Sequence, residues 1–134
     1  MVVDTSALVA IPLREPDAAR YDRCLADAPV RLRSAVTRGE LACVIEGRKG
    51  PRGRVALETL LRAAEFEIAA VTPEQADLAI SAFRRFGKGR HRAALNIGDC
   101  FSYALARATG HPLLFKGDDF VHTDVRSALP PPRP

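Results

Sequence analysis

Four places in the chain carry carboxylates where a freely solvated acid is not expected. Asp4 follows a short apolar segment that we expect to be a buried strand, and Asp118 and Asp119 follow another. Glu40 shares an i, i+4, i+8 row with two valines, so it falls on the apolar face of its helix. Asp99 lies in the first turn of a later helix and borders its apolar stripe. Gathered together, such carboxylates repel one another unless a hard cation such as Mg²⁺ or Mn²⁺ neutralises them.

Each of these carboxylates also has an ordinary structural explanation. Asp4 is a favoured residue for capping the helix that follows it. Glu40 could pair with a buried arginine such as Arg38, and Asp99 suits the positive end of its helix dipole. Either Asp118 or Asp119 could face a metal ion, and we favour Asp118 because the strand reaches it first.

Strand and helix patterns alternate along the chain, which predicts a three-layer α/β/α fold with a central parallel sheet of four to five strands. The expected strands are residues 2–3, 30–34, 67–71 and 111–115, with a possible fifth edge strand at residues 123–125. The second contains two arginines, so we expect it at the outside of the sheet. If the first and fourth strands are neighbours, the acids that follow them share one edge.

The length of 134 residues predicts a single domain with a sizeable core. We expect this domain to span residues 1–128 and the proline-rich residues 129–134 to form an unfolded tail. No apolar run approaches the roughly 20 residues of a membrane span, and the first residues do not look like a signal peptide, so we expect a cytoplasmic protein with no membrane partner. The three cysteines and three histidines have no metal-binding spacing.

Basic side chains are concentrated in two acid-free segments, and the formal net charge is +4. Residues 48–54, rich in glycine and proline, are expected to form a basic loop. The second segment supplies the candidate RNA-binding residues Arg84, Arg85, Lys88, Arg90 and Arg92. Such segments often only keep a loop solvated, but beside an acidic site they suit contacts with a phosphate backbone. Acids, a hard cation and basic loops together predict phosphodiester hydrolysis.

Three segments and one intervening acid carry a family resemblance. Residues 1–8, 95–104 and 113–120, with Glu40 between the first two, closely resemble PIN-domain toxins of the VapC type. The resemblance runs to about residue 125. It implies a PIN-like fold and a Mg²⁺-dependent endoribonuclease, with Mn²⁺ as a substitute, that is the toxin of a type II toxin–antitoxin pair. It also implies an antitoxin lying over the active-site groove and a toxin homodimer.

The same resemblance implies the composition of the site. Asp4, Glu40, Asp99 and Asp118 would be its acidic residues and metal ligands, with Thr5, Ser6 and Asn96 supporting them. A phosphatase of the haloacid dehalogenase type would need a second aspartate where Ser6 stands. The remaining alternative is a non-catalytic PIN-like module that binds RNA or a partner protein, although such a module gains nothing from buried carboxylates.

Overall fold

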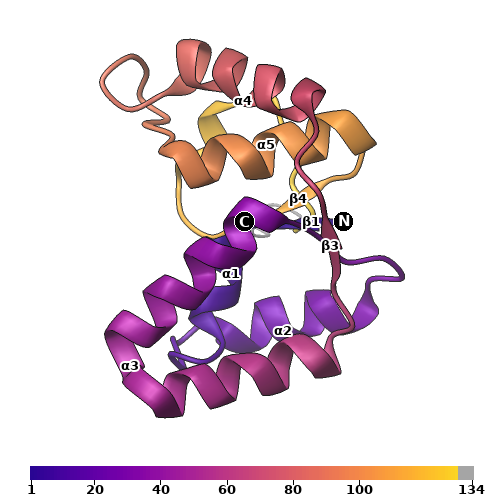
Figure 1. Ribbon diagram of the computed structural model, residues 1–134, viewed down its shortest axis with the longest axis vertical. Helices are drawn as coiled ribbons and strands as arrows, with labels where there is room; N and C mark the ends of the chain where they lie inside the picture. The colour runs from indigo at the N-terminus through magenta and orange to yellow at the C-terminus, as the bar shows by residue number, and fades with distance from the viewer. Residues whose placement is uncertain (130–134) are drawn as a thin grey trace, which may run out of the picture.

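The computed structural model describes residues 1–129, which are built around a parallel sheet in the order β3-β2-β1-β4 (Figure 1). Its four strands are β1 (Val2–Val3), β2 (Leu32–Ser34), β3 (Glu67–Ala69) and β4 (Leu113–Leu114). The helices are α1 (Thr5–Ala10), α2 (Ala18–Asp27), α3 (Ala35–Ala63), α4 (Pro73–Phe86) and α5 (Ile97–Thr109), with a short 3₁₀ helix at Phe120–His122. The structure confirms the predicted three-layer α/β/α fold.

Helices cover both faces of the sheet, and each face has its own apolar core. In Figure 1, α4 and α5 lie on one side of the strands and α1, α2 and α3 on the other. Val2 packs in the first core with Leu105, whereas Val3 packs in the second with Leu41. Successive side chains of a strand point to opposite faces, so this two-residue strand serves both cores.

The first and fourth strands are neighbours, as the position of the acids required. Val2 pairs with Leu113 and Val3 with Leu114 in parallel register. The backbone N–H of Asp4 donates to the carbonyl of Leu114 over 2.9 Å, which extends the pairing by one residue. The chain after β1 and the chain after β4 therefore leave the same edge of the sheet.

The prediction of a basic loop at residues 48–54 is wrong, because these residues belong to α3. α3 runs through the segment as two helical halves that meet at Gly50, whose φ of 58° and ψ of −150° are not helical. A glycine adopts a positive φ without steric cost, and Pro51 then sits at the start of the second half, where its missing N–H does no harm. One residue thus makes the sharp bend of α3 seen in Figure 1.

The prediction of an outer second strand is also wrong. β2 lies between β1 and β3, and all three of its residues are buried. The two arginines do not mark an exposed face, because Arg31 donates to the carbonyls of Leu25 and Ala64 at the strand's beginning while Arg33 is fully buried. The exposed edge strand is β3.

The end of the described chain differs from the expectation of a fifth strand. In place of a strand at residues 123–125, a single parallel bridge joins Leu113 to Ser127. Leu129, which the sequence assigned to the tail, is half-buried and packs against the second core. The rest of the predicted tail, residues 130–134, lies outside the described residues. Within residues 1–129, no helix combines the length and the apolar character needed to cross a membrane.

Candidate functional site

Acidic side chains from distant parts of the chain line a cleft of about 360 Å³ at the carboxyl edge of the sheet. We call it the acidic cleft. Its carboxylates come from the end of β1, from α3, from the start of α5 and from the segment after β4: Asp4, Glu40, Asp99 and Asp119, with Glu15 beside them. The structure therefore brings together three of the four acids predicted from the sequence, Asp4, Glu40 and Asp99.

Asp4 is both the cap of α1 and part of the acidic cleft, so its two explanations hold at once. The backbone N–H and the hydroxyl of Ser6 donate to Asp4 Oδ2 over 3.0 and 2.6 Å. The hydroxyl of Ser102, in α5, donates to Asp4 Oδ1 over 2.5 Å. With only 2% of its surface exposed, Asp4 is held rigidly by these three bonds.

Ser102 is a functional candidate that the sequence analysis missed. Its side chain is fully buried, and its hydroxyl joins α5 to the end of β1. The available signal was its position three residues after Asp99, since residues three apart lie on the same side of a helix. Ser6 was predicted to support the site, and its hydroxyl also accepts from the backbone N–H of Lys116 over 3.1 Å, which ties the ends of β1 and β4 together.

Asp99 is held by a capping box at the start of α5. Its Oδ2 accepts from the Asn96 backbone N–H, and the Asn96 side chain accepts from the Asp99 backbone N–H, both over 2.9 Å. Burial, followed by the negative charges of Asp4, Asp119 and Glu40, raises the pKa of Asp99 to about 7, against the lowering effect of the Asn96 hydrogen bond. The cleft therefore carries negative charge that its own side chains do not neutralise.

Glu40 lies directly against the backbone of α5. A side chain at Gly98 would place its Cβ 2.1 Å from Glu40 Oε2, so the absence of a side chain there makes room for the carboxylate. The alternative partner Arg38 pairs instead with Glu58 over 2.8 Å. Gly98 was not identified from the sequence, where it reads only as part of a helix start.

Of the two acids after β4, the structure brings Asp119 into the acidic cleft. Asp118 lines a different pocket, together with Tyr21 and Phe120. Gly117 has a φ of 91°, so the chain turns there and order along the sequence does not decide which carboxylate faces the cleft. The expectation that Asp118 joins the other acids is not met by this arrangement.

Oxygen is the only ligand type these acids supply, which fits a hard divalent cation such as Mg²⁺. Burial is the main cause of the raised pKa of Asp99 and the neighbouring carboxylates add to it, so a bound cation would favour the charged form of this carboxyl. Among residues 1–129, no group of three or more His, Cys, Asp or Glu side chains stands close enough together to hold a metal ion. Serine hydroxyls and backbone N–H groups hold the carboxylates of Asp4 and Asp99 in this arrangement.

Two cations also line the acidic cleft, Arg48 from α3 and Lys116 from the end of β4. Lys116 pairs with Glu15 and with Asp17, the latter over 2.6 Å. Hydrogen bonds to Asp17 and Glu15 raise the pKa of Lys116, so it is fully charged at neutral pH.

The five predicted RNA-binding side chains are all exposed, but they differ in their contacts. Arg85 donates to Asp124 over 3.2 Å and to the hydroxyl of Tyr103 over 3.3 Å, so it is already paired. Arg84 lies in the last turn of α4, whereas Lys88, Arg90 and Arg92 project from the turn that follows the helix. That turn is closed by a bridge from Gly87 to Leu95, one residue before the cleft residue Asn96.

Thr5 bonds to residues of β2 and α3 and not to the acids of the cleft. Its hydroxyl donates to the carbonyl of Thr37 over 3.4 Å and accepts from Arg33 over 3.3 Å. The predicted supporting residues thus divide into Ser6 and Asn96, which bond the acids directly, and Thr5, which joins α1 to α3.

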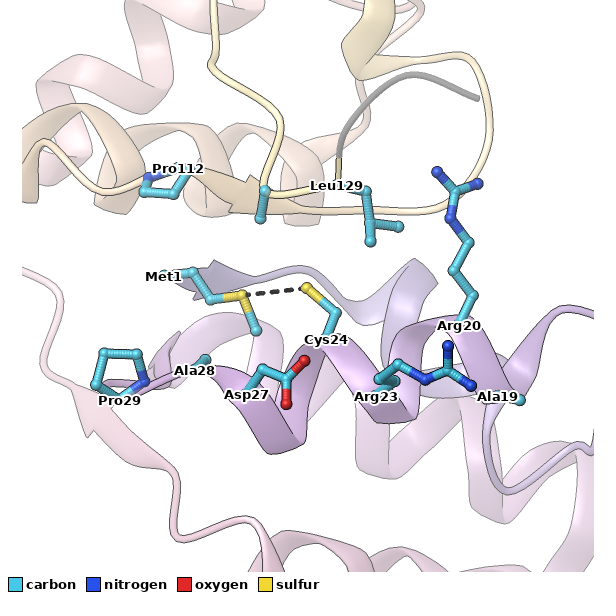
Figure 2. Close-up of a pocket in the computed structure, with 11 residues that line it drawn as sticks. Met1, Ala19, Arg20, Arg23, Cys24, Asp27, Ala28, Pro29, Pro112 and Leu129 are labelled. Atoms are coloured by element: carbon cyan, nitrogen blue, oxygen red, sulfur yellow. Dashed lines mark hydrogen bonds between the residues drawn. The ribbon is translucent and has the colours of Figure 1, made fainter. Parts of the chain in front are cut away.

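A larger cavity, of about 680 Å³, lies beside α2 and carries no such chemistry. We call it the α2 cavity. Figure 2 shows it between α2 and the segments that hold Pro112 and Leu129, with the sulfur atoms of Met1 and Cys24 3.9 Å apart. Among the described residues that line it, Asp27 is the one carboxylate. Size alone therefore does not identify the functional site.

The fold agrees with the comparisons with known proteins. The model of the PIN domain family matches residues 1–126, and the chain belongs to this family. Ribonuclease VapC30 of Mycobacterium tuberculosis is 52% identical over 97% of this chain and 100% of its own length. Ribonuclease VapC of Mycolicibacterium smegmatis is 55% identical over 93% of this chain and 97% of its own. These relatives confirm the resemblance to the VapC type.

Solved structures support the fold at lower identity. VapC20 of Mycobacterium tuberculosis, described as a toxin that cleaves the sarcin–ricin loop, superposes with a TM-score of 0.78 at 22% identity, covering 97% of this chain and 98% of its own. A toxin–antitoxin complex from Klebsiella pneumoniae contains a chain with a TM-score of 0.65 at 19% identity, covering 92% of each. At these identities the likeness concerns the fold alone.

Proposed function

We propose that the protein is a Mg²⁺-dependent endoribonuclease that hydrolyses RNA phosphodiester bonds as the toxin of a type II toxin–antitoxin pair. The observation that carries this proposal is the acidic cleft, where carboxylates from four separated segments meet. Relatives at about half identity over nearly the whole chain bear the name ribonuclease, which supports the same reaction.

The carboxylates of the cleft would hold the metal ion: Asp4, Glu40 and Asp99, with Asp119 as the fourth in place of Asp118. Bound there, Mg²⁺ or Mn²⁺ supplies Lewis acidity that lowers the pKa of a water molecule and stabilises the leaving oxygen. The protein's own part is orientation, because Ser6 and Ser102 fix both oxygens of Asp4 while Asn96 fixes Asp99.

RNA would reach the cleft along its basic border. Arg48 and Lys116 line the cleft itself and offset the repulsion between its acids and a phosphate. Lys88, Arg90 and Arg92 stand on the rigid turn just before Asn96, where they suit contacts with neighbouring phosphates. Arg84 is a further candidate, whereas Arg85 would first have to leave Asp124.

The partner proteins are part of the same proposal. An antitoxin segment would lie over the acidic cleft and shield it from RNA, and the toxin would form a homodimer in the cytoplasm. The relatives' VapC name supports the antitoxin. For the homodimer, exposed apolar side chains on α4, Ile80 and Phe83, provide a surface that can be tested by mutation and sedimentation.

The deciding experiment is cleavage of total RNA by the purified full chain with Mg²⁺, with Mn²⁺ and with EDTA. Asp99→Asn is the inactive variant, and Asp77→Asn on the exposed side of α4 is the matched control. We expect metal-dependent fragments from the wild type and the control but not from Asp99→Asn. Cleavage that survives EDTA or Asp99→Asn would contradict the proposal.

A non-catalytic PIN-like module is the second candidate, and the absence of a pre-arranged metal cluster in residues 1–129 favours it. Calorimetric titration with Mn²⁺ separates the two. Binding that Asp99→Asn weakens supports the nuclease, even where the RNA sample lacks the right target. No binding together with no cleavage would support the module.

A further inference from the structure

Arg33 is the largest fully buried side chain among the described residues, and it lies directly behind the acidic cleft. It stands in β2, in the interior of the sheet, with 0% of its surface exposed. Its neighbour Leu32 packs in the core with α4 and α5. Arg33 therefore points to the opposite face, toward α1 and α3, which supply Thr5 and Glu40 to the cleft.

The hydrogen bonds of Arg33 satisfy only part of its guanidinium. Nη2 donates to the carbonyl of Thr37 over 2.7 Å and to the hydroxyl of Thr5 over 3.3 Å. Nε and Nη1 are buried and have no hydrogen-bond partner among the described residues. A guanidinium carries five N–H donors, and a buried charge is costly unless it is paired. Packing alone would be served better by an apolar side chain of similar size.

The charges that act on Arg33 are those of the cleft. Burial lowers the pKa of Arg33 to about 10, and Asp4 and then Glu40 oppose that shift, whereas Arg38 adds to it. Arg33 is therefore charged at neutral pH, and it bonds to Thr5, which is next to Asp4 in the chain. Arg33 and Asp4 are both shielded from water, so the interaction between their charges is strong and is little screened by salt.

We propose that Arg33 is a built-in counter-charge of the acidic cleft, a positioning residue that offsets Asp4 and Glu40 from the interior and thereby weakens the binding of a divalent cation. This inference rests on the proposed metal-binding function. It explains how the metal-free protein holds several carboxylates around one cleft. It also assigns a role to a charged side chain that has neither solvent nor a carboxylate in contact.

The test is Mn²⁺ affinity, measured by calorimetry on the metal-free full chain. Arg33→Met removes the charge and keeps the length, and Arg33→Gln removes the charge and keeps a donor for Thr37. We expect both to bind Mn²⁺ about tenfold more tightly than the wild type, a change of about 1.4 kcal/mol. Arg33→Lys retains the charge, and we expect it to stay within about twofold of the wild type.

Arg48→Met is the matched control, because Arg48 lines the same cleft but is exposed. Its effect on Mn²⁺ affinity should vanish in about 0.5 M NaCl, where exposed charges are screened, whereas the effect of Arg33→Met should persist. A structural role for Arg33 would not produce tighter binding that depends on charge and resists salt.

The outcomes separate the inference from the function on which it rests. No Mn²⁺ binding by the wild type would overturn both. Binding by the wild type with equal or weaker binding by Arg33→Met and Arg33→Gln would overturn the inference and leave the metal site standing. Neutral variants that fold only with Mn²⁺ present would support the inference, since the metal then becomes the main counter-charge. Neutral variants that fold under neither condition would show a structural residue and overturn it.

Discussion

The two ends of the same parallel sheet have opposite chemistry. The acidic cleft lies beyond the carboxyl ends of β1 and β4, and the α2 cavity lies at their amino ends, where Met1 and Pro112 precede them. Although the α2 cavity is about twice as large, at about 680 against 360 Å³, it carries a single carboxylate. Reactive side chains are thus placed by strand direction and not by available space.

Helix starts explain the difference between the two ends. α1 and α3 begin at the carboxyl ends of β1 and β2, with Asp4 and Ser34 as their caps. The free N–H groups of a helix start favour nearby negative charge. The α2 cavity lies instead along the side of a helix, from Ala19 to Ala28, where most N–H groups are bonded within the helix and give an acid no such support.

The largest difference in RNA cleavage should be seen between variants of Asp4, which is buried at the carboxyl end of the sheet, and of Asp27, which is exposed at the amino end. We expect Asp4→Asn to lower RNA cleavage by about a hundredfold or more, because it removes a fixed charge from the metal site. Asparagine remains a good helix cap, so the fold should be kept. Asp27→Asn at the α2 cavity should leave cleavage unchanged. Comparable loss in both variants, measured as initial rates on one RNA, would remove the distinction between the two ends.

A tenfold contrast is expected within the carboxyl end itself. Asp119→Ala should weaken Mn²⁺ binding by about tenfold, because its carboxylate lines the acidic cleft. Asp118→Ala should change it by less than about twofold, because its carboxylate lines a separate pocket. Calorimetry on the two variants decides the fourth acid, and the reverse order would restore Asp118.

A substitution at Gly98 can move the carboxylate of Glu40 without changing any charged residue. In Gly98→Ala the new Cβ would meet Glu40 Oε2, so the carboxylate must move, and we expect about fivefold weaker Mn²⁺ binding. Gly39→Ala is the control in α3, because open space surrounds that position. It should stabilise the helix by about 1 kcal/mol without affecting Mn²⁺. Equal Mn²⁺ affinities in the two variants would show that the close approach has no role.

The raised pKa of Asp99 predicts how stability depends on pH in the metal-free protein. Between its ordinary pKa near 4 and its folded value of about 7, the folded state holds more protons than the unfolded state, so the free energy of unfolding falls as pH rises through this range. In EDTA, the free energy of unfolding of Asp99→Asn should exceed that of the wild type by about 1 kcal/mol at pH 8, a value that allows for screening by solvent. Near pH 4 the two free energies of unfolding should be equal.

Urea unfolding at several pH values measures this difference directly. Asp27→Asn, at the other end of the sheet, should show no such gain between pH 4 and pH 8. A constant difference between Asp99→Asn and the wild type across that range would mean that Asp99 does not titrate there.

The smallest expected effect concerns RNA affinity. Neutralising Arg90 and Arg92 to Gln should weaken RNA binding about threefold and reduce its salt dependence, because fewer phosphate contacts release counterions. The matched pair Arg20→Gln and Arg23→Gln, at the α2 cavity, should leave the salt dependence unchanged. Titrations at several salt concentrations measure both slopes, and identical slopes in all three proteins would exclude the turn after α4 from the RNA path.

Local sequence patterns predicted the fold well where a residue has one clear preference for a secondary-structure position. The strands β1 and β4 and the helix starts at Asp4 and Asn96 follow from apolar runs and capping residues, whereas the adjacency of the two strands entered the sequence analysis only as a condition. Gly50 shows where such reasoning fails, because a Gly–Pro pair was interpreted as a loop although it only bends a helix.

The site was predictable in its acids but not in the groups around them. Arg33 suggested an exposed strand because charges are normally solvated, and only the assembled molecule shows the carboxylates that act on it. Ser102 and Gly98 have no distinctive pattern, since their role depends on contacts with Asp4 and Glu40 far away in the chain. The choice between Asp118 and Asp119 depends on the turn at Gly117.

The bond between Ser102 and Asp4 joins residues 98 positions apart, and the last acid of the cleft follows at Asp119. During synthesis, Asp4 therefore emerges from the ribosome long before the groups that complete its surroundings. A partly made chain that stops before Asp119 therefore lacks part of the acidic cleft. Completion of the cleft depends on translation having passed this residue.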